Sequence, residues 1–237
     1  MNLVSPQITR LALYVCFALV PAVVHAQKEA AVPVQSPGAK PGPGAGQPKF
    51  SDQQMQEIIL KLRERIGNAA GQVFDRIQKE ESNLRISFTY LRKPDRLDPS
   101  TYGSKDEIAQ WRASIEQTKE KEELLEKLYA NADQDLANAL TQQKINQAIA
   151  EQIKNELLRS FPWSTIKKKN ELMRDYIAEH DALLTFYEKN WGTWKRAPDT
   201  GTPTFDDQQL AATYRSLKER INATGLQIED QYKVMVQ

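Results

Sequence analysis

Residues 164–196, STIKKKNELMRDYIAEHDALLTFYEKNWGTWKR, carry the most regular side-chain pattern in the chain and decide its fold class. Apolar and aromatic side chains, with one asparagine and one histidine among them, recur in alternating steps of four and three residues. This spacing is typical of a coiled-coil seam. The seam positions are Ile166, Asn170, Met173, Ile177, His180, Leu184, Tyr187, Trp191 and Trp194. We therefore predict a long helix over about Ser164 to Arg196.

A similar rhythm extends through most of the chain on both sides of this stretch. It predicts helices over about Ser51 to Leu91, Ser104 to Ser160 and Asp206 to Val234, separated by proline-containing loops. The rhythm of the second of these slips between Asn131 and Lys144, which indicates a stutter or a kink. No segment from residue 51 onward has a convincing strand pattern. We expect an all-α fold, an elongated antiparallel bundle of about four long helices with coiled-coil-like packing.

The first 26 residues have the pattern of a secretory signal peptide. Arg10 and the terminal amine precede an apolar run from Leu11 to Val24. Val24 and Ala26 then occupy the −3 and −1 positions, where a signal peptidase accepts small or β-branched residues. The apolar run is shorter than the roughly 20 residues that span a bilayer, and a membrane anchor is the alternative. We expect cleavage after Ala26 and a periplasmic or secreted mature protein.

Residues 27–49 are rich in proline and glycine and almost lack large apolar side chains. Such a composition cannot bury enough surface to offset the entropy of ordering, so we interpret this stretch as a disordered linker. The expected organisation is a signal peptide over 1–26, this linker, and one helical bundle domain over 50–237. The linker is either a tether that holds the domain away from a membrane or wall, or a simple spacer.

The composition excludes several classes of function. The single cysteine, Cys16, lies in the signal peptide, so the mature chain has no disulfide and no thiolate chemistry. Removing Arg10 from the 32 basic residues leaves 31, which equals the 31 acidic ones. A net charge near zero argues against general nucleic-acid binding.

One histidine, His180, remains after cleavage, and a His-based metal site needs at least two or three ligands. The sequence also has no P-loop, no dinucleotide-binding glycine pattern and no G-x-S-x-G motif. We expect no catalytic residues, no metal, no cofactor and no small-molecule substrate, so the protein is not expected to be an enzyme. His180 falls in the seam and is interpreted as a packing residue. A pH-sensitive contact and a catalytic base are the alternatives.

Two stretches of the chain resemble each other. Residues 48–66 (PKFSDQQMQEIILKLRERI) and 203–221 (PTFDDQQLAATYRSLKERI) are identical at nine of nineteen positions. Part of the likeness is capping chemistry, because Phe50 and Phe205 each precede a predicted helix cap. Capping does not require the later Leu-x-Glu-Arg-Ile to recur. The similarity is either a duplication with a shared docking surface or a coincidence reinforced by capping.

The first of these stretches also resembles a known motif. Phe50-Ser51-Asp52-Gln53-Gln54 is loosely similar to the LTxxQ motif of small helical periplasmic chaperones. The corresponding residues of the second stretch, Phe205-Asp206-Asp207-Gln208-Gln209, resemble the motif more loosely still. The resemblance covers about ten residues. It implies a holdase-type chaperone as an alternative function.

Aromatic side chains crowd the predicted third helix, and at helical spacing they are typical of a core. Tryptophan and tyrosine also anchor interfaces. The candidates for partner contact are Trp163, Tyr187, Trp191, Trp194, His180, Phe50 and Phe205. Lys167, Lys168 and Lys169 at the start of the same helix are interpreted as a solvated face, with a bound anion or phospholipid headgroup as the alternative.

These observations favour a non-catalytic envelope scaffold or adaptor that binds protein partners, or a second copy of itself, through helical faces. Membrane contact is an open alternative.

Overall fold

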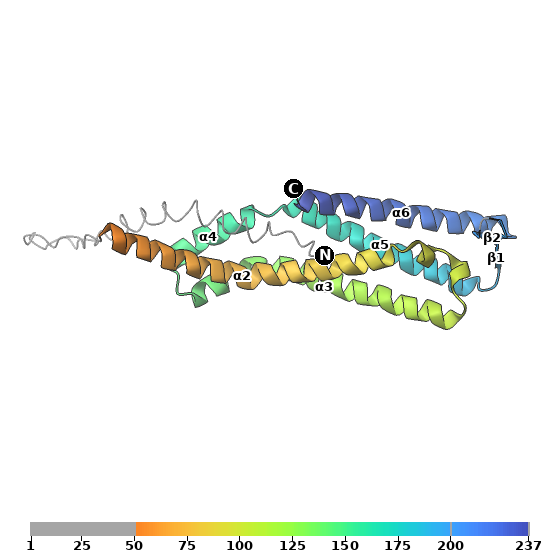
Figure 1. The fold of residues 1–237 in the computed structure, drawn as a ribbon, viewed down its shortest axis with the longest axis horizontal. Coiled ribbons are helices and arrows are strands. Elements are labelled where there is room, and N and C mark those ends of the chain that lie inside the picture. The colour runs from red at the N-terminus through yellow and green to blue at the C-terminus, as the bar shows by residue number, and fades with distance from the viewer. Residues whose placement is uncertain (1–50, 200, 237) are drawn as a thin grey trace, which may run out of the picture. The chain divides into compact units, whose positions relative to one another are not determined.

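The computed structural model describes residues 51–199 and 201–236. The predicted signal peptide, the predicted linker and Phe50 lie outside these residues. The described chain is mostly helical, in agreement with the all-α expectation, and carries one small antiparallel sheet (Figure 1). Within the described ranges, no helix is both long enough and apolar enough to cross a bilayer.

Five α-helices, two short 3₁₀ helices and two strands make up the described residues. Their bounds are α2 Asp52–Leu91, η1 Pro94–Leu97, η2 Pro99–Thr101, α3 Lys105–Gln142, α4 Gln147–Arg159, α5 Trp163–Lys189, β1 Trp194–Arg196, β2 Pro203–Phe205 and α6 Gln208–Val236. The arrangement expected from the sequence, four long helices without strands, therefore needs two corrections.

The first correction concerns the predicted second helix, which is two helices rather than one. α3 ends at Gln142, and Lys144 takes a left-handed backbone conformation with φ of 56°. The side-chain oxygen of Asn146 then accepts from the amide of Ala148 at 3.0 Å and caps α4. The slip in the hydrophobic rhythm marked the region of the break, which falls at the last residues of the predicted interval.

The second correction concerns the end of the predicted third helix. α5 stops at Lys189, and the chain turns through Gly192, whose φ is +81°. Trp194, Lys195 and Arg196 then pair with Phe205, Thr204 and Pro203 as an antiparallel two-stranded ribbon. A strand of three residues is too short to show an alternating pattern in the sequence. Because Trp191 and Trp194 also continue the helical spacing, the predicted helix extended beyond the residue at which α5 ends.

Helix caps explain where two of the helices begin. The hydroxyl of Ser51 accepts from the amide of Gln54 at 3.2 Å, and the Gln54 side chain accepts from the amide of Ser51 at 2.9 Å. This reciprocal capping box confirms the start predicted for α2. At α6 the capping side chain is Asp207, not Asp206, because Asp207 accepts from the amides of Gln209 and Leu210.

The described chain divides into two compact units. Unit 1 contains residues 77–130 and 162–236, and unit 2 contains residues 51–76 and 131–161. α2 and α3 each contribute one part to both units. In unit 1, α5 and α6 run side by side and are joined at one end by the β1–β2 ribbon (Figure 1).

The core of unit 1 is apolar and aromatic. Its fully or almost fully buried side chains include Leu84 and Leu91 of α2, Ile108 and Leu125 of α3, Leu183 and Leu184 of α5, and Ile221 and Ile228 of α6. All four tryptophans of the sequence belong to this unit.

Unit 2 is built from the first part of α2, the last part of α3, and α4. Its buried residues are Ile66, Ala69, Ala70, Val73 and Phe74 from α2, Ala132, Leu136, Ala139 and Leu140 from α3, Ile145 from the connection, and Ile149, Ala150, Ile153 and Leu157 from α4. The rings of Phe74 and Phe161 lie 4.8 Å apart. Lys154 of α4 reaches Asp133 of α3 at 3.1 Å, which joins these two helices by an ion pair.

Candidate interaction surfaces

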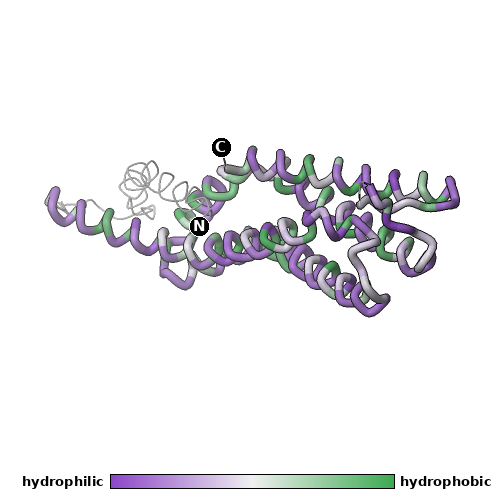
Figure 2. Tube along the Cα trace, turned by 45° about the vertical axis from the view of Figure 1, so that its right-hand side comes forward, coloured by the Kyte–Doolittle hydropathy of each residue, from purple (hydrophilic) through white to green (hydrophobic). Residues whose placement is uncertain are grey.

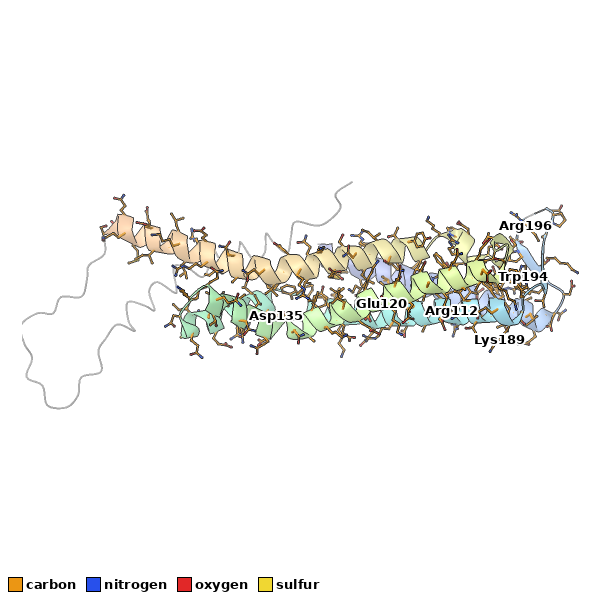
Figure 3. All side chains as sticks on the ribbon, turned by 90° about the horizontal axis from the view of Figure 1, so that it is seen from below. Arg112, Glu120, Asp135, Lys189, Trp194 and Arg196 are labelled. Atoms are coloured by element: carbon orange, nitrogen blue, oxygen red, sulfur yellow. The ribbon has the colours of Figure 1, made fainter. Side chains whose placement is uncertain are left out.

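An aromatic cluster forms where α5 ends and α6 begins. The ring of Trp194 lies 5.9 Å from that of Tyr187 and 6.4 Å from that of Phe205, and Trp191 meets Trp194 edge-on at 5.3 Å. Phe205 in turn lies 5.4 Å from Tyr214 of α6. The ribbon thus brings four of the sequence-derived candidates together at one end of unit 1, where Figure 3 labels Trp194 and Arg196.

Exposure differs sharply within this cluster. Tyr187 is fully buried, so it has no surface with which to touch a partner, and it acts as the ring on which the ribbon packs. Trp191, Trp194 and Phe205 are half-buried. Trp191 and Trp194 do not lie at the end of the predicted helix, because they belong to a turn and a strand that fold back against α5.

Arg112 fixes α3 against the same end of α5. Its guanidinium forms an ion pair with Asp181, a second one with Glu188 at 3.0 Å, and a hydrogen bond to the hydroxyl of Thr185 at 3.3 Å. The acceptors lie one and two turns apart on one face of α5. Arg112 therefore fixes the position of α3 relative to the end of α5 that carries the aromatic cluster (Figure 3).

The other two described candidates lie away from this cluster. Trp163 is at the start of α5, 37% exposed, with its ring 6.1 Å from that of Tyr129. His180 is fully buried, with its ring 4.6 Å from that of Tyr176, and neither of its nitrogens has a hydrogen-bond partner among the described residues. Burial lowers the pKa of His180 to about 4, so the ring is neutral near pH 7.

The lysine run at the start of α5 divides between surface and core. Lys167 and Lys168 are exposed, whereas Lys169 is fully buried and forms an ion pair with the carboxylate of Glu81 in α2. The rings of Tyr129 and Tyr232 lie 5.9 and 5.7 Å from its ammonium group. The expectation of a solvated face is wrong for this lysine, because its partner is distant in the sequence.

The first turns of α2 carry a surface that sequence reasoning missed. Met55, Ile59 and Leu62 continue the stripe that is buried from Ile66 onward, yet all three are only half-buried. Ile58 beside them is 37% exposed. We call Met55, Ile58, Ile59 and Leu62 the α2 stripe. Figures 1 and 3 show this end of α2 extending past the end of α4, so the first turns of α2 lie beyond the helices that cover the rest of unit 2.

The second copy of the repeated motif, in α6, can be compared with the α2 stripe position by position. By the alignment of 48–66 with 203–221, Ile59, Leu62 and Ile66 correspond to Tyr214, Leu217 and Ile221. The three residues in α6 are buried, with exposures of 8%, 8% and 1%. In the α2 copy Ile59 and Leu62 are half-buried and Ile66 is buried, so the two copies differ at two of these three positions. Figure 2 shows hydrophobic residues recurring among hydrophilic ones along this end of α2. The sequence signalled the face by its periodicity, but a periodicity does not report whether a face has a partner.

No group of three or more His, Cys, Asp or Glu side chains within residues 51–199 and 201–236 is placed to hold a metal ion. Comparison with known proteins finds no match to a family model, to a curated protein or to a solved structure.

Proposed function

We propose that this protein is an exported, non-catalytic helical scaffold or adaptor that binds protein partners through helical faces, with the α2 stripe as its principal contact. The observation that supports the proposal is the contrast between the two copies of the repeated motif. The copy in α6 buries Tyr214 and Leu217, whereas the corresponding Ile59 and Leu62 in the α2 copy are half-exposed.

The stripe is large enough to matter for binding. Burying an aliphatic side chain of this size contributes about 1.5–3 kcal/mol when it goes from exposed to fully buried. Met55, Ile59 and Leu62 are already half-covered, so each contributes part of that amount. Four such side chains on one helical face match the way an amphipathic helix lies against a partner helix or groove.

The packing of the α6 copy indicates what kind of partner fits. Phe186 of α5 lies 5.8 Å from Phe205 and 6.5 Å from Tyr214, ring centre to ring centre. The corresponding positions in the α2 copy include Ile59. The partner we propose is a helix with an apolar, aromatic-containing stripe, supplied by another protein or by a second copy of this chain.

Charge along this part of α2 adds an orientation. Asp52 and Glu57 lie in its first turns, and Lys61, Arg63 and Arg65 lie further along, with Glu64 among them. A partner helix with its basic residues beside Asp52 and its acidic ones beside Arg65 is favoured over the reverse arrangement. The predicted signal peptide and linker support a site of action in the cell envelope.

The test is chemical crosslinking of the exported protein in the cells that produce it, followed by purification and mass spectrometry. Ile58→Gln and Leu62→Gln remove the apolar surface, and Glu57→Gln and Glu64→Gln are matched controls on the opposite face of the same helix. We expect one or two stoichiometric partners that are lost with the stripe variants and kept with the controls.

Capture of many unrelated, partly unfolded proteins would contradict the adaptor proposal and support the holdase-type chaperone. Retention of the same partners by both stripe variants would exclude the α2 stripe as the contact. Far-UV circular dichroism establishes that each variant keeps its helical content.

A further inference from the structure

Unit 1 contains a cavity of about 250 Å³ that none of the sequence-derived candidates touches. Leu97, Tyr176 and Ile221 line it with apolar surface, and Arg92, Lys218 and Asn222 line it with polar groups. The residues come from the turn that follows α2, from η1, from α5 and from α6. The cavity therefore lies where these four segments of one unit meet.

The walls of the cavity are held in place by specific contacts. The hydroxyl of Tyr214 donates to the carbonyl of Leu97 at 2.7 Å and fixes η1 against α6. Arg92 forms an ion pair with Glu229, which fixes the end of α2 against the same helix. Both contacts are made by the protein's own residues, so they hold the walls of the cavity in place and binding would cost little further ordering.

Gly225 permits the close approach of one wall. A side-chain carbon at this position would lie 3.3 Å from Cε2 of Tyr176 and 3.5 Å from Nε of Arg92. The contact with the tyrosine ring would be tight, so even alanine would require this ring, which lines the cavity, to shift by a few tenths of an ångström. On α6, Lys218, Asn222, Gly225 and Glu229 follow one another at helical spacing and form a single face.

The charge of the cavity is positive at one place. Arg92 is balanced by Glu229, whereas no carboxylate within residues 51–199 and 201–236 forms an ion pair with Lys218. Lys218 is half-buried, and its ammonium group lies 5.9 Å from the ring of Tyr214. A half-buried cation beside an exposed amide, Asn222, offers hydrogen-bond donors to an anion.

We propose that this cavity binds a small carboxylate that carries a short apolar chain. Lys218 and Asn222 hold the carboxylate, with Arg92 at the same rim, and the chain lies against Leu97 and Ile221. Most of the exposed lining is polar, and the apolar side chains of Leu97 and Ile221 favour such a ligand over a bare anion, because the chain buried against them adds to the affinity. The volume lies below the roughly 300–1,000 Å³ of pockets for drug-sized ligands, so the ligand is small.

In the first test, the mature protein is titrated separately with hexanoate, acetate and inorganic phosphate. Binding is measured by isothermal titration calorimetry and by the shift of the Asn222 side-chain amide signal in NMR spectra. We expect hexanoate to bind saturably at one site and to shift that signal. Acetate shares the headgroup and phosphate shares only the charge, so both should bind at least about tenfold more weakly. Equal binding of all three, or no saturable binding of hexanoate, would overturn the proposal.

The second test compares two variants of α6, in each of which one basic residue is replaced by glutamine. Lys218→Gln removes the cation at the rim and should weaken hexanoate binding about tenfold. Arg215→Gln removes one positive charge from an exposed position of the same helix, away from the cavity, and should leave the affinity unchanged. Equal effects of the two variants, or none in Lys218→Gln, would show that the cavity is not the site. If Lys218→Gln does not fold, Asn222→Ala is measured in its place, against the same control and with the same two outcomes.

Discussion

Lys169 of α5 donates to the carboxylate of Glu81 of α2 inside the core of unit 1, where the lysine has no exposed surface. Burial lowers the pKa of Lys169, and the neighbouring carboxylate opposes that shift. Near it, Glu122 of α3 is 2% exposed on its side chain and pairs with Arg174 at 3.2 Å. These charges tie three helices together across a core that is mostly apolar and aromatic.

Removing one partner of this pair should destabilise unit 1 strongly. Lys169→Met leaves the Glu81 carboxylate buried without its cation, and we expect the free energy of unfolding to fall by about 3–5 kcal/mol. Combining it with Glu81→Leu removes both charges and should restore most of the loss. Urea unfolding followed by tryptophan fluorescence measures this, since all four tryptophans lie in unit 1. If the single and double variants were equally stable, the pair would not be a buried, coupled one.

His180 makes the stability of unit 1 depend on pH. Its pKa is lowered by burial from 6.5 to about 4, so protons bind the unfolded chain more tightly than the folded one. The stabilisation is complete above about pH 6.5 and is lost as the pH falls toward 4, by an amount on the order of 3 kcal/mol. His180→Leu should flatten this part of the profile.

Carboxyl groups such as Glu122 and Glu179 also titrate in acid, but they are present in both the wild type and the His180→Leu variant. The informative quantity is therefore the difference between the pH profiles of wild type and His180→Leu. A difference that stays constant between pH 7 and pH 4 would mean that His180 is hydrated rather than buried.

Substitutions in the aromatic cluster should lower the free energy of unfolding by different amounts at a core residue and at a residue on the edge. Tyr187→Ala removes a fully buried ring, and we expect a loss of about 3–5 kcal/mol in the free energy of unfolding. Trp191→Ala removes a half-buried ring at the edge and should cost less than about 1.5 kcal/mol. Urea unfolding of the two variants provides the comparison. Equal losses would show that Trp191 belongs to the core.

The break between α3 and α4 gives a prediction whose sign is decisive. Lys144 has a positive φ, a conformation that costs L-residues energy and glycine very little. Lys144→Gly should therefore raise the free energy of unfolding of unit 2 by about 0.5–1 kcal/mol. In one continuous helix the same change would lower it by a similar amount. Thermal unfolding followed by circular dichroism distinguishes the two, and Asn146→Ala, which removes the cap, should cost about 1 kcal/mol.

The features that are local in the sequence were the ones that could be predicted. The periodicity marked helical segments, and the Ser51–Gln54 capping box fixed the start of α2, because both depend on residues within one or two turns. The β1–β2 ribbon was missed, since Trp194 and Trp191 continue the helical spacing and the short ribbon forms through pairing with residues further along the chain.

The candidate surface could be predicted only in part. The motif comparison pointed to residues 48–66, but four of the aromatic residues favoured as contacts, Tyr187, Trp191, Trp194 and Phe205, are half-buried or buried against one another. The burial of Lys169 depends on Glu81, which lies 88 positions away, and no local pattern reports such a partner. In the same way, whether the α2 stripe is covered depends on how far α4 extends alongside it.

The most direct measurement replaces single residues of α2 with a photo-crosslinking amino acid in the exported protein. Leu62 lies in the α2 stripe, and Glu64 lies on the opposite face of the same helix. The account predicts a discrete protein adduct from position 62, with a partner or with a second copy of the chain, and no such adduct from position 64. Adducts of equal yield at both positions, or only at position 64, would contradict the claim that this protein binds its partners through the α2 stripe.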